Sequence, residues 1–312
     1  MKKLLQNKIA ESKLAWPVTL VYATIVWLQA GLVKEGWWMQ FAMFGIAALL
    51  MAHLNNLNAL IRIYSRLVTC AFTVFTCCAC FLFPALPDKF LQLCLVVAYL
   101  LLFNSYQDKE ATAWVYYAFL CLGLATLVFP QICYFLPLFW LLTATQLQSL
   151  SWRTFMASLL GVVTPYWCYS CWLVWQGDFS PLANHLAGVL DFDMHTNVLA
   201  LDNCRLLTLI FLLVMFVTGT VHYIRKKSAD KIRIRQLFGF FIWTSLFTIA
   251  FLCLQPQHFD RLLPILIVNV SPLAAHFIAL TGTKITNAAV LTLMAAALLL
   301  TIYNLWSTSS LF

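Results

Sequence analysis

Long apolar stretches separated by short polar breaks run through almost the whole of this 312-residue sequence. Most of them approach the roughly 20 residues that a helix needs to cross about 30 Å of hydrocarbon. Charged residues make up 10% of the chain, whereas soluble domains contain about 25%. The sequence therefore predicts an all-α fold, a polytopic bundle of about 11 transmembrane helices, with a range of 9–11. The stretches cover 14–33, 37–60, 67–86, 90–105, 113–129, 132–149, 154–175, 204–224, 237–254, 263–280 and 287–306.

The basic residues predict the orientation of these helices. When the polar breaks are assigned alternately to two sides, 15 of the 19 Lys and Arg residues fall on the side of the N-terminus. Short loops rich in Lys and Arg remain cytoplasmic. We therefore expect a cytoplasmic N-terminus, a basic cytoplasmic loop at 225–236 and, after an odd number of spans, an outer C-terminus. The outer side holds only Lys34, Lys89, Arg205 and Arg261.

Composition also indicates how many domains the chain has and which partners it is expected to bind. No internal repeat or hydrophilic appendage interrupts the apolar pattern, so a single integral membrane domain over 1–312 is expected. The net charge of +8 is accounted for by cytoplasmic loops that face anionic headgroups. Membrane lipids are therefore the expected partners, and nucleic acid is not. Because phosphate-binding loops and dinucleotide motifs are missing, no nucleotide cofactor is expected.

The longest outer break, 177–203, is predicted to contain a short helix that lies on the membrane surface. Ser180 followed by Pro181 is typical of a helix start, with Ser180 as the N-cap. Acidic residues and a histidine follow, and an Asp-x-Asp pair can hold a divalent cation or provide a general base. These residues are Asp191, Asp193 and His195. The alternative interpretation is a set of solvated loop acids without a role.

A second outer break, 255–262, combines a base, an acid and a cation at the mouth of the stretch 263–280. His258, Asp260 and Arg261 lie within four residues, and Arg205 begins the stretch 204–224 on the same side. Guanidinium groups match phosphate oxygens in a forked geometry. We expect Asp191, Asp193, His258 and Asp260 to be catalytic, and Arg205, Arg261 and His195 to bind substrate. The alternative is an interfacial anchor with a local ion pair.

The same residues carry a local resemblance. His258, Asp260, Arg261, Leu263 and Pro264, followed by Ser271-Pro272, resemble the late motif of membrane glycosyltransferases that use polyprenyl-phosphate sugars. The resemblance covers about fifteen residues and implies a polyprenyl-phosphate carrier as a partner. Those enzymes place a catalytic acid in a large first outer loop, which is reduced here to Lys34-Glu35-Gly36.

A broader resemblance extends over residues 50 to 280. The strings that carry it are Asn56-Leu57-Asn58, Phe83-Pro84, Phe129-Pro130, Arg153 with Gly161 and Pro165-Tyr166, and the basic run Arg225 to Arg235. On these strings the chain resembles an uncharacterised family of bacterial multi-pass proteins of the Bacteroidota type, which implies a bacterial inner membrane and no established activity.

Three classes of function remain open from the sequence. A lipid-linked glycosyltransferase with an outward-facing site predicts that Asp191, Asp193 and Arg261 converge within about 10 Å. At that distance the aspartate that acts as base and the arginine that binds the phosphate can contact the same substrate. A transporter or lipid flippase predicts a path along Pro165 and along Asn55 or Asn58. A non-catalytic scaffold or subunit predicts no polar cavity and a lipid-facing stripe that fits another protein.

Overall fold

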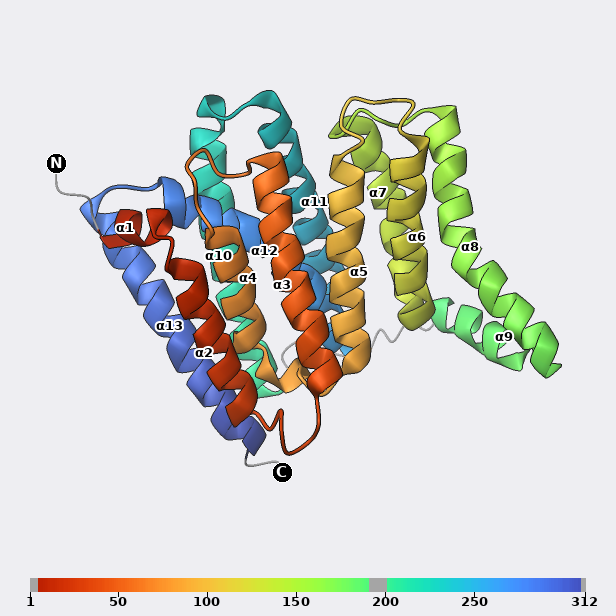
Figure 1. Ribbon diagram of the computed structural model, residues 1–312, viewed down its shortest axis with the longest axis horizontal. Helices are drawn as coiled ribbons and strands as arrows, with labels where there is room; N and C mark the ends of the chain where they lie inside the picture. The colour runs from red at the N-terminus through yellow and green to blue at the C-terminus, as the bar shows by residue number, and fades with distance from the viewer. Residues whose placement is uncertain (1–4, 191–200, 310–312) are drawn as a thin grey trace. The chain divides into compact units, whose positions relative to one another are not determined.

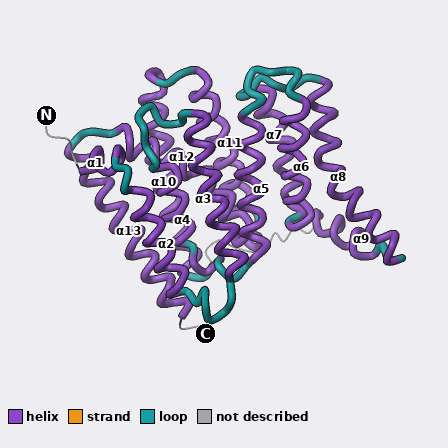
Figure 2. The backbone as a smooth tube through the Cα atoms, in the orientation of Figure 1, coloured by secondary structure: helices purple, strands orange, loops and turns teal. Residues whose placement is uncertain are grey.

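A computed structural model describes residues 5–190 and 201–309 (Figure 1). Within these ranges the chain consists of helices and connecting loops, with no strand (Figure 2). This confirms the all-α class. Seven helices are long and apolar enough to cross a membrane: α3 (Trp38–Asn58), α5 (Leu86–Phe103), α8 (Trp152–Gln176), α10 (Asn203–Lys226), α11 (Ile232–Leu254), α12 (Phe259–Leu280) and α13 (Lys284–Ser309).

Four further apolar helices are shorter. They are α2 (Ala15–Gln29), α4 (Leu67–Cys78), α6 (Thr112–Val128) and α7 (Phe135–Thr145), the last preceded by a 3₁₀ turn at Pro130–Tyr134. Seven long and four short helices together match the eleven predicted stretches one to one. The fold is therefore that of a membrane-embedded multi-pass protein, while the number of complete spans and the orientation stay predictions.

Helix α8 illustrates why a long apolar helix fits a bilayer. Its 25 residues give a length of about 38 Å at 1.5 Å per residue. Exposed tryptophans stand near both ends, Trp152 at the first and Trp172 and Trp175 at the other. Tryptophan prefers the two interfaces between hydrocarbon and water. The spacing of these side chains thus agrees with a helix that reaches from one interface to the other.

The described residues divide into two compact units, 1–89 with 196–312, and 90–195. In the first unit, α12 is the central helix and contacts α4, α10 and α11. Almost every side chain of α12 is buried. Helix α10 approaches it closely at Gly219, where a Cβ atom would lie 2.8 Å from the backbone of Leu273. Such close contacts between small residues and a neighbouring backbone are typical of membrane helix packing.

Polar side chains join the helices at the end of this unit that is predicted to be cytoplasmic. Arg62 Nε lies 2.8 Å from Asp230 Oδ1, and Asp230 Oδ2 lies 3.3 Å from Nε2 of the fully buried His276. Asp230 belongs to the basic loop 225–236. The carboxylate therefore ties this loop to α12 and to the loop that follows α3.

The amides of α3 have protein partners of their own. The Asn55 side chain donates to the carbonyl of Ser65 at 2.9 Å, and the Asn58 side chain accepts from Arg233 at the same distance. Both amides are buried. Their hydrogen bonds connect α3 to its following loop and to α11, which is a structural role.

In the second unit, α6 and α8 make the most extensive pairing of helices. A Cβ atom at Gly161 would lie 2.5 Å from the Tyr116 carbonyl oxygen, and one at Gly123 would lie 2.8 Å from the Val162 carbonyl oxygen. Pro165 lies inside α8 at this contact, with its Cγ 3.1 Å from the Cβ position of Gly123. Gly161 and Pro165 are thus explained by tight helix packing.

A short helix, α9 (Ser180–Ala187), follows α8, and a 3₁₀ turn continues it over Gly188–Leu190. The prediction that Ser180 is the N-cap is wrong. Ser180 is the first helical residue, and Asp178 accepts hydrogen bonds from its backbone N–H at 2.8 Å and its hydroxyl at 2.9 Å. A carboxylate two residues before the helix can reach both donors, and these bonds lower the pKa of Asp178.

Polar contacts hold this segment against the rest of the second unit. His185 Nε2 lies 3.1 Å from the Thr126 carbonyl oxygen and 3.3 Å from the Tyr166 hydroxyl. The side chains of Gln131 and Tyr134 donate to the carbonyls of Gly188 and Val189. These bonds fix α9 and its 3₁₀ turn to α6, to α8 and to the turn that precedes α7.

Candidate functional site

A cluster of charged side chains lies where α5, α10 and α12 begin, in the first unit. Arg205, in the first turn of α10, donates from Nε to Asp260 Oδ1 at 2.8 Å and from Nη2 to Asp260 Oδ2 at 2.9 Å. Two parallel bonds of this kind give the strongest and most directional form of Arg–carboxylate pairing. The guanidinium also lies over the ring of Phe81, 5.5 Å from its centroid. Arg205 is therefore held in one orientation by an acid and a ring.

The neighbouring residue of α12 makes a second ion pair with another helix. Arg261 Nε lies 2.9 Å from Asp88 Oδ1, and Asp88 is in the first turn of α5. The Asp88 side chain is 2% exposed, whereas the Asp260 side chain is 41% exposed. In the first turn of α12, Asp260 therefore pairs with α10 and Arg261 pairs with α5.

Lys89 adds a third cation that is almost completely buried. Its Nζ lies 5.0 Å from the ring centroid of Phe83 and 5.6 Å from that of Trp27. The two rings are stacked in parallel at 3.8 Å. The faces of aromatic rings attract cations, most strongly where water is excluded. Lys89 is therefore stabilised by aromatic side chains next to Asp88.

The sequence predicts part of this cluster and misses part of it. Of the predicted site residues, Arg205 pairs with Asp260, and Arg261 follows Asp260 in the first turn of α12, while their role in a site and their outer location stay predictions. Asp88 and Lys89 are not among the site residues that the sequence predicts. The available signal was two adjacent charges after Pro87 at the edge of an apolar stretch, since charges inside membrane helices are rare and functional more often than elsewhere.

The other predicted site residues have different positions. His258 is the last residue of a 3₁₀ turn, Pro256–His258, directly before α12, and its Nε2 lies 3.3 Å from the Gln257 side-chain nitrogen. Glu35 pairs with Lys34 at 3.6 Å on an exposed loop. Asp191, Asp193 and His195 lie outside the described residues. The expected convergence of Asp191 and Asp193 with Arg261 is therefore not tested, nor is the divalent cation that this Asp-x-Asp pair could hold. Within residues 5–190 and 201–309, no group of three or more His, Cys, Asp or Glu side chains could hold a metal ion.

The geometry assigns different chemical roles to the two acids. Both oxygens of Asp260 accept from Arg205, so this carboxylate orients a guanidinium. Asp88 is buried beside two cations, Arg261 and Lys89. Asp202, directly before α10, also acts electrostatically on Arg205, so three cations stand beside three carboxylates. About a third of each arginine side chain is exposed, and a guanidinium can donate to several oxygens of one anion.

No protein-family model, curated protein or solved structure matches this chain. The interpretation of the cluster therefore depends on its own residues and distances.

Proposed function

We propose that this chain is a cell-envelope enzyme of the lipid-linked glycosyltransferase type, in the bacterial inner membrane, with an outward-facing site. The charged cluster around Arg205, Arg261 and Lys89 would bind the phosphate of a polyprenyl-phosphate carrier. The observation that supports this most is that three cations from three helices gather at one end of the first unit, oriented by Asp88 and Asp260.

The cluster can offer several donors to one phosphate group. A guanidinium has five N–H donors, and Asp260 accepts from two of those of Arg205. About a third of the Arg205 and Arg261 side chains is exposed. The first turns of α10 and α12 also carry the positive ends of their helix dipoles, which favour an anion at this position.

The expected reaction is the transfer of a sugar from the carrier to a hydroxyl acceptor. The bond between the sugar's anomeric carbon and the phosphate oxygen breaks, and polyprenyl phosphate leaves with the bonding electrons. A new bond forms from the anomeric carbon to the acceptor oxygen, whose proton passes to a carboxylate base. The sequence assigns this base to Asp191 or Asp193, and the arginines would stabilise the charge on the leaving phosphate.

Binding of polyprenyl monophosphate tests the phosphate half of the proposal. The protein would be placed in nanodiscs of zwitterionic phospholipid and titrated with the lipid phosphate. We expect Arg205→Gln and Arg261→Gln each to weaken binding about tenfold, because a charge-assisted hydrogen bond contributes about 1.5–3 kcal/mol. Lys34→Gln is the matched control, since Lys34 is a highly exposed cation on the same predicted side. Equal affinity for polyprenyl monophosphate in the unaltered protein and the three variants would contradict the proposal.

A transfer assay tests the enzymatic half. Purified protein would be incubated with polyprenyl-phosphate sugars and a hydroxyl-bearing acceptor, and released polyprenyl phosphate would be measured. We expect release that depends on Arg205 and Arg261 and on Asp191 or Asp193. Binding with movement of the intact lipid across a vesicle membrane would favour the flippase alternative. Neither binding nor movement, with a stoichiometric protein partner after mild purification, would favour the scaffold.

A further inference from the structure

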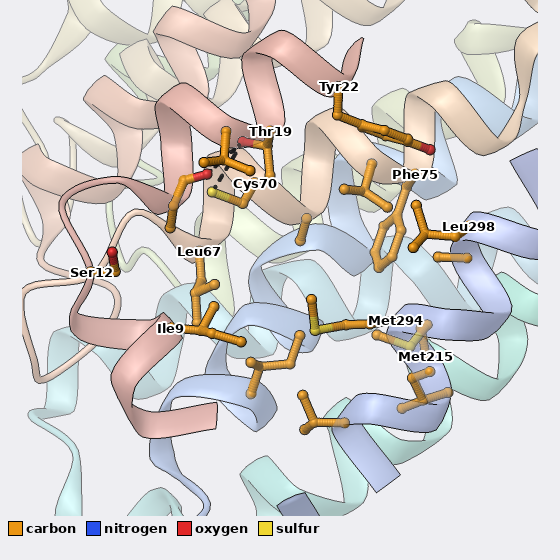
Figure 3. Close-up of a pocket in the computed structure, with 18 of the residues that line it drawn as sticks. Ile9, Ser12, Thr19, Tyr22, Leu67, Cys70, Phe75, Met215, Met294 and Leu298 are labelled. Atoms are coloured by element: carbon orange, nitrogen blue, oxygen red, sulfur yellow. Dashed lines mark hydrogen bonds between the residues drawn. The ribbon is translucent and has the colours of Figure 1, made fainter. Parts of the chain in front are cut away.

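A cavity of about 540 Å³ lies in the first unit between α2, α4 and α13, next to α1 (Leu5–Glu11) (Figure 3). Its wall is almost entirely apolar. In Figure 3, Ile9 and Ser12 lie at one end of the cavity, and Tyr22 and Leu298 lie at the other. Its inner wall comes from α4, where Leu67, Cys70 and Phe75 are buried.

The cavity opens toward the outer surface of the helices. Val18 of α2 is 64% exposed and Leu298 of α13 is 50% exposed, and both line the cavity. In a membrane-embedded protein, that surface faces hydrocarbon chains and not water. An apolar chain can therefore enter sideways between α2 and α13.

The hydroxyl groups that line the cavity are already bonded within the protein. Thr19 donates to the Ala15 carbonyl at 3.1 Å, and the hydroxyls of Tyr22 and Thr301 are 2.7 Å apart. Ser12 Oγ accepts from the Leu14 backbone N–H at 3.1 Å. Because the hydroxyls of Thr19 and Tyr22 already have partners in the protein and Ser12 lies at one end of the cavity, the buried part of an occupant has to be apolar.

Cations flank one end of the cavity. Lys8 is next to the lining residue Ile9, and Lys13 lies between the lining residues Ser12 and Leu14. Both lysines are exposed. Arg66 precedes the lining residue Leu67, and its guanidinium lies 5.8 Å from the centroid of the Trp16 ring. This end also belongs to the side that the basic residues predict to be cytoplasmic.

We propose that the cavity holds an acyl chain of an anionic phospholipid from the cytoplasmic leaflet, with its headgroup next to Lys8, Lys13 and Arg66. The apolar wall accepts the chain, and the lateral opening lets it enter from the bilayer. In the described part of the chain, Glu11, next to Ser12, is the one acid beside these three cations, so two positive charges remain in excess at this end and complement a negative headgroup, as juxtamembrane basic clusters do. This proposal does not rest on the proposed function, because no residue of the cluster around Arg205 lines the cavity.

Measuring how much lipid is retained by variants that obstruct the cavity tests whether the cavity holds an acyl chain. Val18→Trp places a large ring at the opening, while Val21→Trp adds the same ring to an exposed position of α2 outside the cavity. Each protein would be extracted in mild detergent from membranes that contain phosphatidylglycerol, and bound lipid would be counted by native mass spectrometry. We expect Val18→Trp to lose at least 80% of the retained lipid and Val21→Trp to lose none. Equal retention would overturn the proposal.

A second pair of variants keeps the test decisive if Val18→Trp does not fold. Leu298→Trp obstructs the cavity from α13, and Leu299→Trp adds the ring to the adjacent exposed position outside it. Loss of lipid confined to Leu298→Trp supports the site. Retention in both variants overturns it.

The headgroup is tested by competition between lipids. Delipidated protein would be titrated with phosphatidylglycerol and with phosphatidylcholine of identical chains. We expect Lys8→Gln and Lys13→Gln each to reduce the preference for phosphatidylglycerol about fivefold, because one basic residue near the membrane surface contributes about 1 kcal/mol. Lys34→Gln, on the other predicted side, should leave it unchanged. Equal binding of both lipids to the unaltered protein would overturn an anionic occupant.

Discussion

Arg205 and Asp260 face each other with two parallel hydrogen bonds, of 2.8 Å and 2.9 Å, that join the first turns of α10 and α12. Next to Asp260 in the chain, Arg261 makes an ion pair with the buried Asp88 of α5. One turn of α12 therefore fixes the beginnings of two other helices. Asp260 accepts from two of the five N–H donors of the Arg205 guanidinium.

The forked pairing of Arg205 predicts that lysine cannot replace it. Arg205→Lys keeps the positive charge but provides a single point donor in place of the planar fork. We expect affinity for polyprenyl monophosphate to fall about tenfold, with a stability cost of only about 0.5–1 kcal/mol, because the pair is partly exposed. Titration in nanodiscs and thermal unfolding in detergent would measure the two effects. A variant with unchanged affinity would show that the fork is not used for binding.

Asp88 and Asp260 should differ in their importance for stability. Asp88→Asn removes the buried carboxylate that pairs with Arg261 and lies beside the buried Lys89, and we expect a loss of about 2–3 kcal/mol in the free energy of unfolding. Asp260→Asn affects an exposed pair and should cost about 0.5–1 kcal/mol. Unfolding by denaturant in detergent would compare them. A larger cost for Asp260→Asn would mean that burial does not determine the effect.

The packing of α6 against α8 predicts opposite effects for two glycine substitutions. Gly161→Ala brings a methyl group to 2.5 Å from the Tyr116 carbonyl oxygen, so the helices have to separate, at a cost of about 1–3 kcal/mol. Gly45→Ala, in the middle of α3, meets nothing within 4 Å and should gain about 0.5–1 kcal/mol from helix propensity. Thermal unfolding would compare the two variants with the unaltered protein. Stabilisation by Gly161→Ala would contradict the observed packing.

The positions and lengths of the apolar stretches predict the helices well, because a helix that crosses a bilayer needs a continuous run of hydrophobic residues. The alternation of charge also agrees with the side-chain pairing. Two ion pairs between segments far apart in the sequence, Arg62 with Asp230 and Arg261 with Asp88, each join groups predicted on the same side. Contacts between distant helices were not predictable, because they depend on how helix faces pack. The pairing of Asp88 with Arg261 and the aromatic surroundings of Lys89 are of this kind.

The attachment of the basic loop 225–236 to the core predicts a change in proteolysis. Asp230 contacts Arg62 and His276, so Asp230→Ala removes the side chain that ties the loop to α12. We expect trypsin to cleave after Lys226, Lys227 or Lys231 about tenfold faster in the variant, since a protease needs a locally opened backbone. The matched control is Glu110→Ala, because Glu110 forms only a long, exposed pair with Arg153 at 3.9 Å.

The same experiment in sealed vesicles checks the orientation: cleavage should occur in inside-out vesicles and not in right-side-out ones. Cleavage only in right-side-out vesicles would reverse the predicted topology and place the cluster around Arg205 in the cytoplasm.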